Sequence, residues 1–238
     1  MSIADNVKRV REQIAEAEAR AGRVPGAVTL VAVTKTFPVE TVLAGYAAGL
    51  RDFGENRVQE AETKIDAASA QAREARWHLI GHLQSNKVKA AVGHFDMIHS
   101  VDSLKLARAI SSRFRDLHGH VKRIPVLVEV NVGEEPSKSG YRLSDADAFW
   151  REAEQIAALP GVELQGLMTI APWSARAEDA RPCFARLREL RAALARRLGR
   201  ALPQLSMGMS GDFAVAVEEG ATLVRIGSAI FGERTKTT

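Results

Sequence analysis

The chain contains very little cysteine, few aromatic residues and no long apolar run. Its single cysteine, Cys183, excludes an internal disulfide and leaves no cysteine-based metal site. No segment reaches the roughly 20 apolar residues that a membrane span needs, and the first helix-forming stretch is too charged throughout for a signal peptide. We therefore expect a soluble, cytoplasmic protein with no metal and no membrane partner.

Aromatic residues make up 5% of the sequence against 46% hydrophobic residues in total, so the core must be mainly aliphatic. The formal net charge of +4 is mild for 238 residues and does not by itself indicate a nucleic-acid partner. Much of the excess is arginine within residues 176–200, where apolar residues recur at helical spacing. A solvated helix face explains this pattern better than an RNA-binding or phosphate-binding strip. We expect no nucleic-acid partner.

Short apolar runs alternate with helical patterns along the chain. Residues 1–22 indicate a first amphipathic helix, because apolar residues return at steps of four and three before Gly22. The candidate strands that follow are 28–34, 52–54, 77–81, 97–100, 124–131, 164–170, 204–206 and 222–226. Helical patterns fill the gaps at 39–49, 57–72, 84–92, 103–117, 144–159, 177–198 and 212–219.

Eight alternations of strand and helix at this length predict an α/β fold, a single (β/α)₈ TIM barrel with an additional N-terminal helix packed on it. An open doubly wound sheet is the alternative, but no Gly-x-Gly-x-x-Gly follows the first strand. No linker or low-complexity tract interrupts the pattern. We therefore expect one domain over residues 1–238.

Lys35 directly follows the first apolar run. A run this short, without alternation, is typical of a strand buried on both faces. Lys35 is then expected at the carboxyl end of a parallel strand, where barrels collect their ligands. Partial desolvation would lower the pKa of its amine and free the amine as a nucleophile toward carbonyl groups. From this segment alone, a structural lysine that reaches water by its long stem is the simpler interpretation.

The rest of the sequence favours the functional interpretation, because polar residues follow the other predicted strands as well. They are Glu55, Asn56, His82, Gln84, Asn86, Asp102, Ser103, Asn131 and Thr169. In a barrel these positions share one rim, the rim that carries active sites. Two other patterns are weaker. His118 and His120 lack a third ligand for a metal site. The segment 137–140 could bind an anion, but a mobile polar loop is the simpler interpretation.

Two glycine-containing segments give the most specific signal. Ser206-Met-Gly-Met-Ser210-Gly211 leads into an amphipathic helix, and Gly227-Ser228 follows the last strand. Barrels often hold a phosphate group with these two loops, through backbone N–H groups. Ser210 could equally be a simple helix N-cap. Arg225 lies inside the last strand and needs a partner there, either a carboxylate such as Glu55 or Glu129, or a ligand.

Taken in order, several motifs resemble the pyridoxal phosphate homeostasis proteins, the family also called YggS or PROSC. They run nearly the whole length of the chain: Val33-Thr-Lys35-Thr, Phe53-Gly-Glu-Asn56-Arg-Val-Gln-Glu60, Trp77-His-Leu-Ile-Gly81-His-Leu-Gln-Ser-Asn-Lys87, Ser137-Lys-Ser-Gly140, Gly166-Leu-Met168, Ser206-Met-Gly-Met-Ser210-Gly-Asp212 and Val224-Arg-Ile-Gly227-Ser228-Ala-Ile-Phe-Gly232. The resemblance implies a barrel similar to the N-terminal domain of bacterial alanine racemases.

The resemblance also implies the cofactor, pyridoxal 5′-phosphate, and the residues that hold it. Lys35 would carry the cofactor as a Schiff base. Ser210, Gly227 and Ser228 would hold its phosphate. Arg225 would face the pyridine nitrogen, and Asn56 would lie near the oxygen side of the ring.

Two functions compete: a carrier or buffer of the cofactor in vitamin B6 homeostasis, and an amino-acid racemase or related enzyme. Racemisation needs acid/base groups on both faces of the substrate α-carbon. In the alanine racemases the second group is a tyrosine from another domain of a partner subunit, which we expect to be absent because this chain ends just after the eighth strand. Tyr46 lies in a helix away from the rim, and Tyr141 stays open as a candidate base.

We therefore favour a carrier without catalytic residues. We expect a monomer that makes transient contacts with enzymes that depend on pyridoxal phosphate. A third possibility is a phosphate-binding barrel enzyme that never uses this cofactor and binds its substrate with Lys35.

Overall fold

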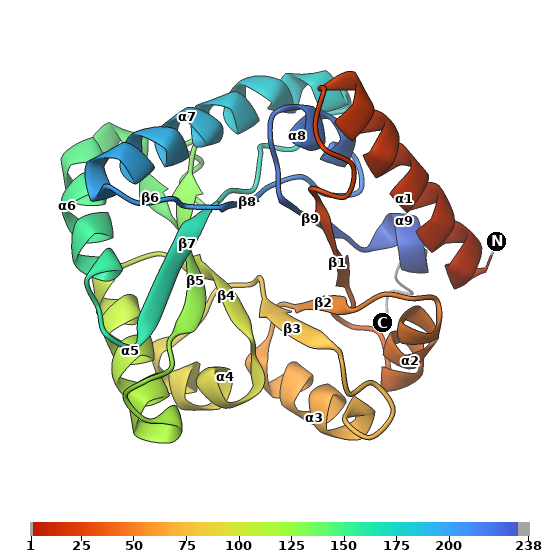
Figure 1. Ribbon diagram of the computed structural model, residues 1–238, viewed down its shortest axis with the longest axis horizontal. Helices are drawn as coiled ribbons and strands as arrows, with labels where there is room; N and C mark the ends of the chain where they lie inside the picture. Colours follow the sequence, from red (N-terminus) through yellow and green to blue (C-terminus); the bar gives the residue numbers. More distant parts are fainter. Residues whose placement is uncertain (1, 233–238) are drawn as a thin grey trace.

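A computed structural model describes residues 2–232 and shows a closed ring of parallel strands surrounded by helices (Figure 1). The barrel strands are β1 Thr29–Val33, β2 Asp52–Glu55, β3 Arg76–Leu79, β4 Met97–Val101, β5 Ile124–Asn131, β7 Val162–Met168, β8 Gln204–Ser206 and β9 Leu223–Ile226. The pairings of β1 with β9 and of β4 with β5 close the ring. The predicted (β/α)₈ barrel is confirmed. Residues 1 and 233–238 of the expected domain lie outside the described residues.

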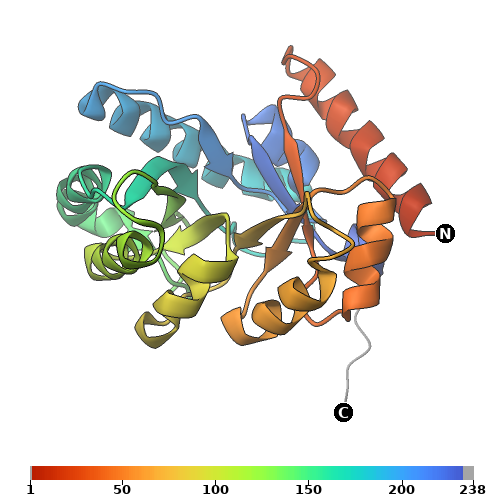
Figure 2. The same cartoon turned by 60° about the horizontal axis from the view of Figure 1, so that its bottom comes forward.

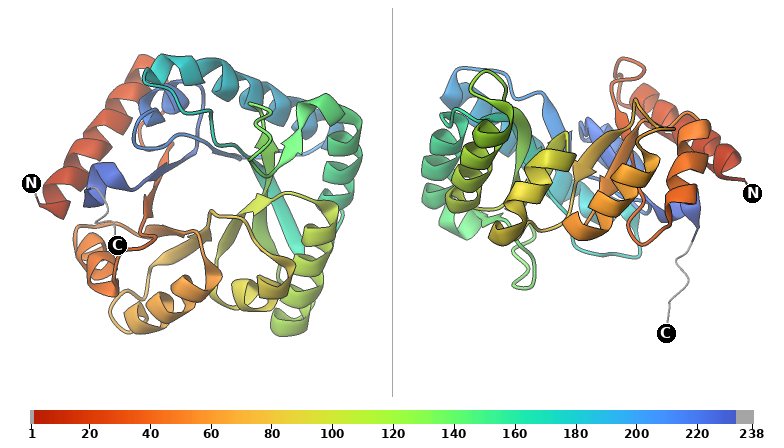
Figure 3. Two further views of the ribbon diagram at one scale, coloured as in Figure 1. Left: turned by 180° about the vertical axis from the view of Figure 1, so that it is seen from behind. Right: turned by 90° about the horizontal axis from the view of Figure 1, so that it is seen from below.

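Helices cover the outside of the barrel in every view (Figure 3). Their bounds are α1 Ile3–Arg20, α2 Val39–Ala47, α3 Val58–Ala68, α4 Val88–His94, α5 Leu104–His118, α6 Ala146–Ala157, α7 Arg181–Leu198, α8 Phe213–Glu218 and α9 Ser228–Phe231. The predicted N-terminal helix, α1, begins with a capping box between Ser2 and Asp5. It packs along α8 and α9 on one side of the barrel (Figure 2).

Two short elements were not predicted. β6, Tyr141–Arg142, pairs with Val130 and Asn131 at the end of β5, outside the closed ring. α9 forms the last turn after β9. Elements of two and four residues are too short to show a periodicity, so only the neighbouring strand and helices decide them.

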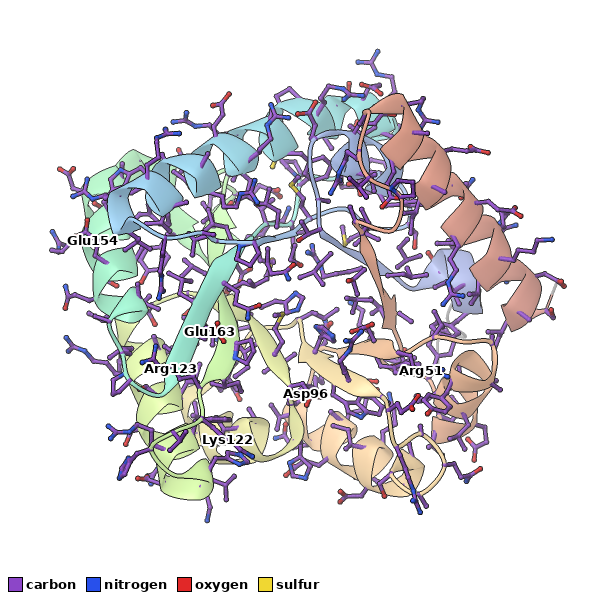
Figure 4. The ribbon with its side chains drawn as sticks, viewed as in Figure 1. Arg51, Asp96, Lys122, Arg123, Glu154 and Glu163 are labelled. Atoms are coloured by element: carbon purple, nitrogen blue, oxygen red, sulfur yellow. The ribbon has the colours of Figure 1, made fainter. Side chains whose placement is uncertain are left out.

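The core has two parts. Most buried apolar side chains lie between the strands and the helices, while a small cluster fills the inside of the barrel: Val31, Met97, Leu127, Met168 and Leu223. The remaining interior is polar, and Figure 4 shows side chains filling the ring. On the arginine-rich α7, the apolar stripe from Phe184 to Leu194 is buried, and Arg181 and Arg188 form ion pairs with Glu218 and Glu219. These contacts agree with a structural helix face.

Among the described residues, no helix is long and apolar enough to cross a bilayer. Within the same part of the chain, no three His, Cys, Asp or Glu side chains are placed to hold a metal ion.

Candidate functional site

Lys35 follows β1 at the carboxyl-terminal rim of the barrel and is half-buried. The next residue, Thr36, has φ +67°, a left-handed conformation that is uncommon for a non-glycine residue. The carboxylate of Glu60 accepts the Thr36 N–H, and Thr34 O accepts the Phe37 N–H at 3.0 Å. Because such strain persists only where surrounding contacts impose it, the turn that carries Lys35 has a defined geometry.

A second lysine, Lys64 of α3, lies behind this turn. Its ammonium donates to Thr34 O at 2.8 Å, to Glu55 Oε1 at 2.6 Å and to Glu60 Oε1 at 3.1 Å. Since an ammonium group has three N–H donors, these acceptors satisfy it completely. Lys64 is therefore a structural cation. The sequence analysis did not identify it, although the i, i+4 pair with Glu60 was visible in the sequence.

Asn56 follows β2 on the same rim and is half-buried. Gly81, after β3, comes so close that a Cβ atom there would lie 2.4 Å from Asn56 O. The glycine is therefore required for the loops after β2 and β3 to meet. Asn56 and Gly81 line an open depression of about 420 Å³ together with His82, Gln84 and Lys87.

The structure brings the two glycine-containing loops together. Ser210 Oγ accepts the Ala229 N–H at 3.3 Å, which ties the loop after β8 to the loop after β9. Ser210 makes no side-chain N-cap bond to α8, and α9 begins at Ser228 immediately after Gly227. A depression of about 560 Å³ is lined by Ser210 and Ala229, and also by Arg9, Arg20, Glu16 and Asp212.

Arg225 points into the barrel and is almost fully buried. Its Nη1 donates to Ser206 Oγ at 2.6 Å, and its Nη2 donates to Thr169 O at 2.9 Å. Neither Glu55 nor Glu129 forms a hydrogen bond with it among the described residues, so the structure does not show the carboxylate pair, which was one of the two alternatives for its partner. Burial lowers the pKa of Arg225 to about 10, while the charges of Glu129 and Asp212 act in the opposite direction. The guanidinium therefore stays cationic at neutral pH.

Glu129, on β5, is a buried carboxyl group whose charge raises the pKa of Arg225. Its Oε2 has no hydrogen-bond partner among the described residues. Burial raises the pKa of Glu129 to about 7, and the charge of Asp102 adds to this effect. Gly140 lies against it, because a Cβ there would be 3.0 Å from Glu129 Cγ. Among the described residues, the interior thus holds a carboxyl group with a raised pKa and one oxygen, Oε2, without a hydrogen-bond partner.

Asn131 holds the loop that contains Ser137–Gly140. Its amide donates to Glu135 O at 2.8 Å and accepts the Glu135 N–H at 3.2 Å. Lys138 pairs with Glu135 and also donates to Ala171 O at 3.2 Å. These hydrogen bonds anchor the loop at Asn131, Glu135 and Lys138.

Both tyrosine hydroxyls form hydrogen bonds within the protein. Tyr141 donates from its hydroxyl to Glu152 Oε2 of α6 at 2.6 Å and packs edge-on against Phe149. Burial, and then this hydrogen bond, raise the pKa of Tyr141 far above its usual value. The Tyr46 hydroxyl accepts the Glu74 N–H at 3.4 Å, near the amino-terminal ends of the strands. The candidate second base is therefore engaged elsewhere.

The sequence analysis missed a polar chain inside the barrel. It consists of Asp52, His78, His99 and Ser206, and it reaches Arg225. His78 and His99 stand as polar residues inside strand patterns, and this was the signal that the sequence offered.

Residues 3–235 match the family model described as alanine racemase, N-terminal domain. A pyridoxal phosphate homeostasis protein of Aquifex aeolicus is 44% identical over 234 residues, covering 98% of this chain and 99% of that protein. A protein of the same name from Pseudomonas aeruginosa is 45% identical over 233 residues, covering 98% of this chain and 96% of its own.

Solved structures agree with these matches. PipY of Synechococcus elongatus with PLP bound superimposes with a TM-score of 0.84 at 37% identity, covering 97% of this chain and all of that one (100%). An alanine racemase from Clostridium difficile has a TM-score of 0.67 at 15% identity, and the match covers 98% of this chain and 57% of that one. The second likeness shows the shared barrel fold alone.

Proposed function

Because this chain belongs to the family of pyridoxal phosphate homeostasis proteins, on the fold of the alanine racemase N-terminal domain, we propose that it binds pyridoxal 5′-phosphate and carries or buffers it in the cell. One observation carries the proposal. A relative of 37% identity that matches over its full length is described with PLP bound, and the rim of this barrel offers an amine, an interior cation and an anion cradle.

Each proposed ligand residue has a place that suits its role. Lys35 Nζ would form the Schiff base, Ser210, Gly227 and Ser228 would bind the phosphate, and Asn56 would contact the oxygen side of the ring. The cofactor, when bound, supplies an electrophilic aldehyde on an aromatic ring. The bond between Ser210 and Ala229 shapes the cradle before any phosphate binds. The unpartnered Glu129 Oε2 is a further acceptor facing the interior.

Arg225 favours storage of the cofactor over catalysis. A guanidinium beside the pyridine nitrogen disfavours protonation of that nitrogen and so weakens the ring as an electron sink. The hydroxyls of Tyr141 and Tyr46 are bound to Glu152 and to the Glu74 backbone, so neither is proposed as the second proton-transfer group that racemisation needs. We propose a non-enzymatic role on these grounds, and the comparisons favour it over the racemase alternative.

We also propose that the chain acts as one domain and as a cytoplasmic monomer that meets enzymes requiring pyridoxal phosphate only transiently. Trp173 supports such contacts, because its side chain is 89% exposed beside the carboxyl-terminal rim. It lines a depression of about 350 Å³ with Met209 and Asp212. An exposed aromatic side chain at the mouth of a site is suited to a short-lived interface.

The proposal is tested by fixing the bound cofactor with borohydride and mapping the modified peptide. Purified protein should absorb in the visible range, and the reduced label should sit on Lys35. Lys35→Ala should lose most of the absorbance. Lys138→Ala is the matched control, because it removes a lysine from the same rim and should retain the label on Lys35. A label found mainly on Lys87 or Lys138 would contradict the assignment.

A further inference from the structure

Five polar residues form a continuous hydrogen-bonded chain across the barrel interior. Asp52 Oδ1 lies 3.0 Å from His78 Nε2, and His78 Nδ1 lies 2.9 Å from His99 Nε2. His99 Nδ1 lies 2.9 Å from Ser206 Oγ, which lies 2.6 Å from Arg225 Nη1. The chain therefore connects β2, β3, β4, β8 and β9.

The chain is buried at one end and reaches water at the other. His99 and Ser206 are completely inaccessible, and Arg225 is 4% exposed. Asp52 is the first residue of β2 and also binds Arg76, whose side chain is 61% exposed. Asp52 and Arg76 border an open depression of about 420 Å³ at the amino-terminal rim. The chain thus runs from this rim to the guanidinium.

The two ends fix the direction of every hydrogen bond. An arginine has only donors and a carboxylate only acceptors, so Ser206 Oγ accepts from Arg225 and Asp52 accepts from His78 Nε2–H. A neutral His78 that donates from Nε2 has a lone pair at Nδ1. His99 must therefore donate its Nε2–H to this lone pair. His99 Nδ1 is left as an acceptor for the Ser206 hydroxyl. All donors therefore point from Arg225 toward Asp52.

The reverse direction requires an additional buried proton. If His99 carried its proton on Nδ1, its Nε2 lone pair would need a donor at His78 Nδ1. His78 also donates to Asp52, so it would have to be an imidazolium. Burial holds the pKa of His99 well below 6.5, so His99 itself has one proton only.

We propose that Asp52, through His78, His99 and Ser206, is a positioning residue that fixes the orientation and the donor pattern of Arg225. Arg225 forms its hydrogen bonds with a hydroxyl and a carbonyl oxygen, and the chain that begins at the hydroxyl ends at the carboxylate of Asp52. The charges of Glu129 and Asp212 also act on Arg225 but form no hydrogen bond with it among the described residues. Aligned hydrogen bonds polarise one another, and the carboxylate at the end stabilises the cation at the start.

The consequence for the ligand rests on the proposed function. A guanidinium held cationic and in one plane presents a fixed positive edge to a pyridine nitrogen. The amino-terminal rim lies away from the predicted ligand residues. Through the chain it would still influence the affinity for the cofactor and the electronic state of the pyridine ring. Asp52 is the first residue of β2, at the rim opposite to Lys35 and to the loops after β8 and β9, so its effect on the ligand would act through the chain.

The direct test needs no ligand. Nitrogen-15 NMR of the imidazoles in cofactor-free protein at pH 8.5 should show His78 and His99 both protonated on Nε2 only. Asp52→Ala removes the final acceptor and should convert His99 to a mixture of tautomers. Nδ1–H on His99 in the unsubstituted protein would overturn the assignment, as would an unchanged His99 tautomer in folded Asp52→Ala.

Further variants separate the chain from simple charge and folding effects. Figure 4 labels Glu163 at the same rim, exposed on β7, and Glu163→Gln removes an equal charge outside the chain. His78→Phe cuts the chain but leaves the ion pair of Asp52 with Arg76, so it serves if Asp52→Ala does not fold.

In titrations with pyridoxal phosphate, His78→Phe and Asp52→Ala should bind about fivefold more weakly or worse, with a shifted visible absorbance maximum, and Glu163→Gln should match the unsubstituted protein. Equal affinity and an unchanged absorbance maximum in both chain variants would refute the positioning role. If the unsubstituted protein binds no pyridoxal phosphate, the proposed function fails, whereas the tautomer result still decides the structural claim.

Discussion

Lys64 Nζ lies 2.6 Å from Glu55 Oε1, and both side chains are almost completely buried behind the turn that carries Lys35. Glu60 and Thr34 O complete the contacts of this ammonium group. The pair therefore links α3 to the ends of β1 and β2. A lysine that is satisfied in this way is a poor nucleophile, so Lys64 is not expected to compete with Lys35 for the proposed Schiff base.

The first prediction concerns this ion pair. Lys64→Met leaves Glu55 buried without its cation and should lower the free energy of unfolding by about 3–5 kcal/mol in urea denaturation. The double variant Lys64→Met/Glu55→Gln should recover much of the loss, because no uncompensated charge remains. Lys8→Met, in an exposed pair with Glu12, is the control and should have no measurable effect. A small loss in the single variant would show that water reaches Glu55.

A second prediction follows from Glu129. Its folded-state pKa, about 7, lies above the ordinary value of 4.5, so the folded protein binds more protons between these pH values. Ionisation of Glu129 therefore destabilises the fold increasingly as pH rises from 4.5 to 7. Glu129→Gln should be more stable than the unsubstituted cofactor-free protein at pH 8.5, by up to about 3 kcal/mol, and equally stable at pH 4.5.

The measurement for Glu129 is the urea midpoint across this pH range, with exposed Glu163→Gln as a control that should follow the unsubstituted protein. Parallel curves for Glu129→Gln and the unsubstituted protein at all pH values would show that the Glu129 pKa is not raised.

The third prediction tests the phosphate cradle. Ser210→Asp places a negative charge beside the proposed phosphate position and should weaken binding of pyridoxal phosphate by at least about tenfold. Binding of pyridoxal, which lacks the phosphate, should already be weak and should change little. Ser137→Asp adds the same charge at an exposed position of the rim and should leave both affinities unchanged. Equal affinity for pyridoxal and its phosphate would exclude the cradle.

A fourth prediction concerns turnover. Protein loaded with pyridoxal phosphate and incubated with L-amino acids in deuterated water should incorporate almost no α-deuterium and form almost no D-isomer, because the Tyr141 hydroxyl is bound to Glu152. Tyr141→Phe should not change this baseline. Steady incorporation that disappears in Lys35→Ala would show that the protein is an enzyme, and its loss in Tyr141→Phe would identify the base.

Most of the fold was predictable because burial leaves a local mark. Unbroken apolar runs such as 124–131 identify strands that are covered on both faces, and this prediction matches β5 to the residue. The four-and-three spacing on α1 and α7 likewise marks helices with one buried stripe. β6 escaped because two residues carry no period, and its pairing with the end of β5 exists only in three dimensions.

The site divides in the same way. The sequence alone determined that Lys35 follows the first strand and that glycine-containing loops follow the last two, since chain order places strand ends on one rim. Only the tertiary structure decided which charge faces which. Arg225 binds Ser206 and Thr169 and not Glu55, while Glu55 binds Lys64. Partners across a closed barrel depend on the register and stagger of strands far apart in the sequence, and a side chain buried there takes whichever acceptor that register brings within about 3 Å.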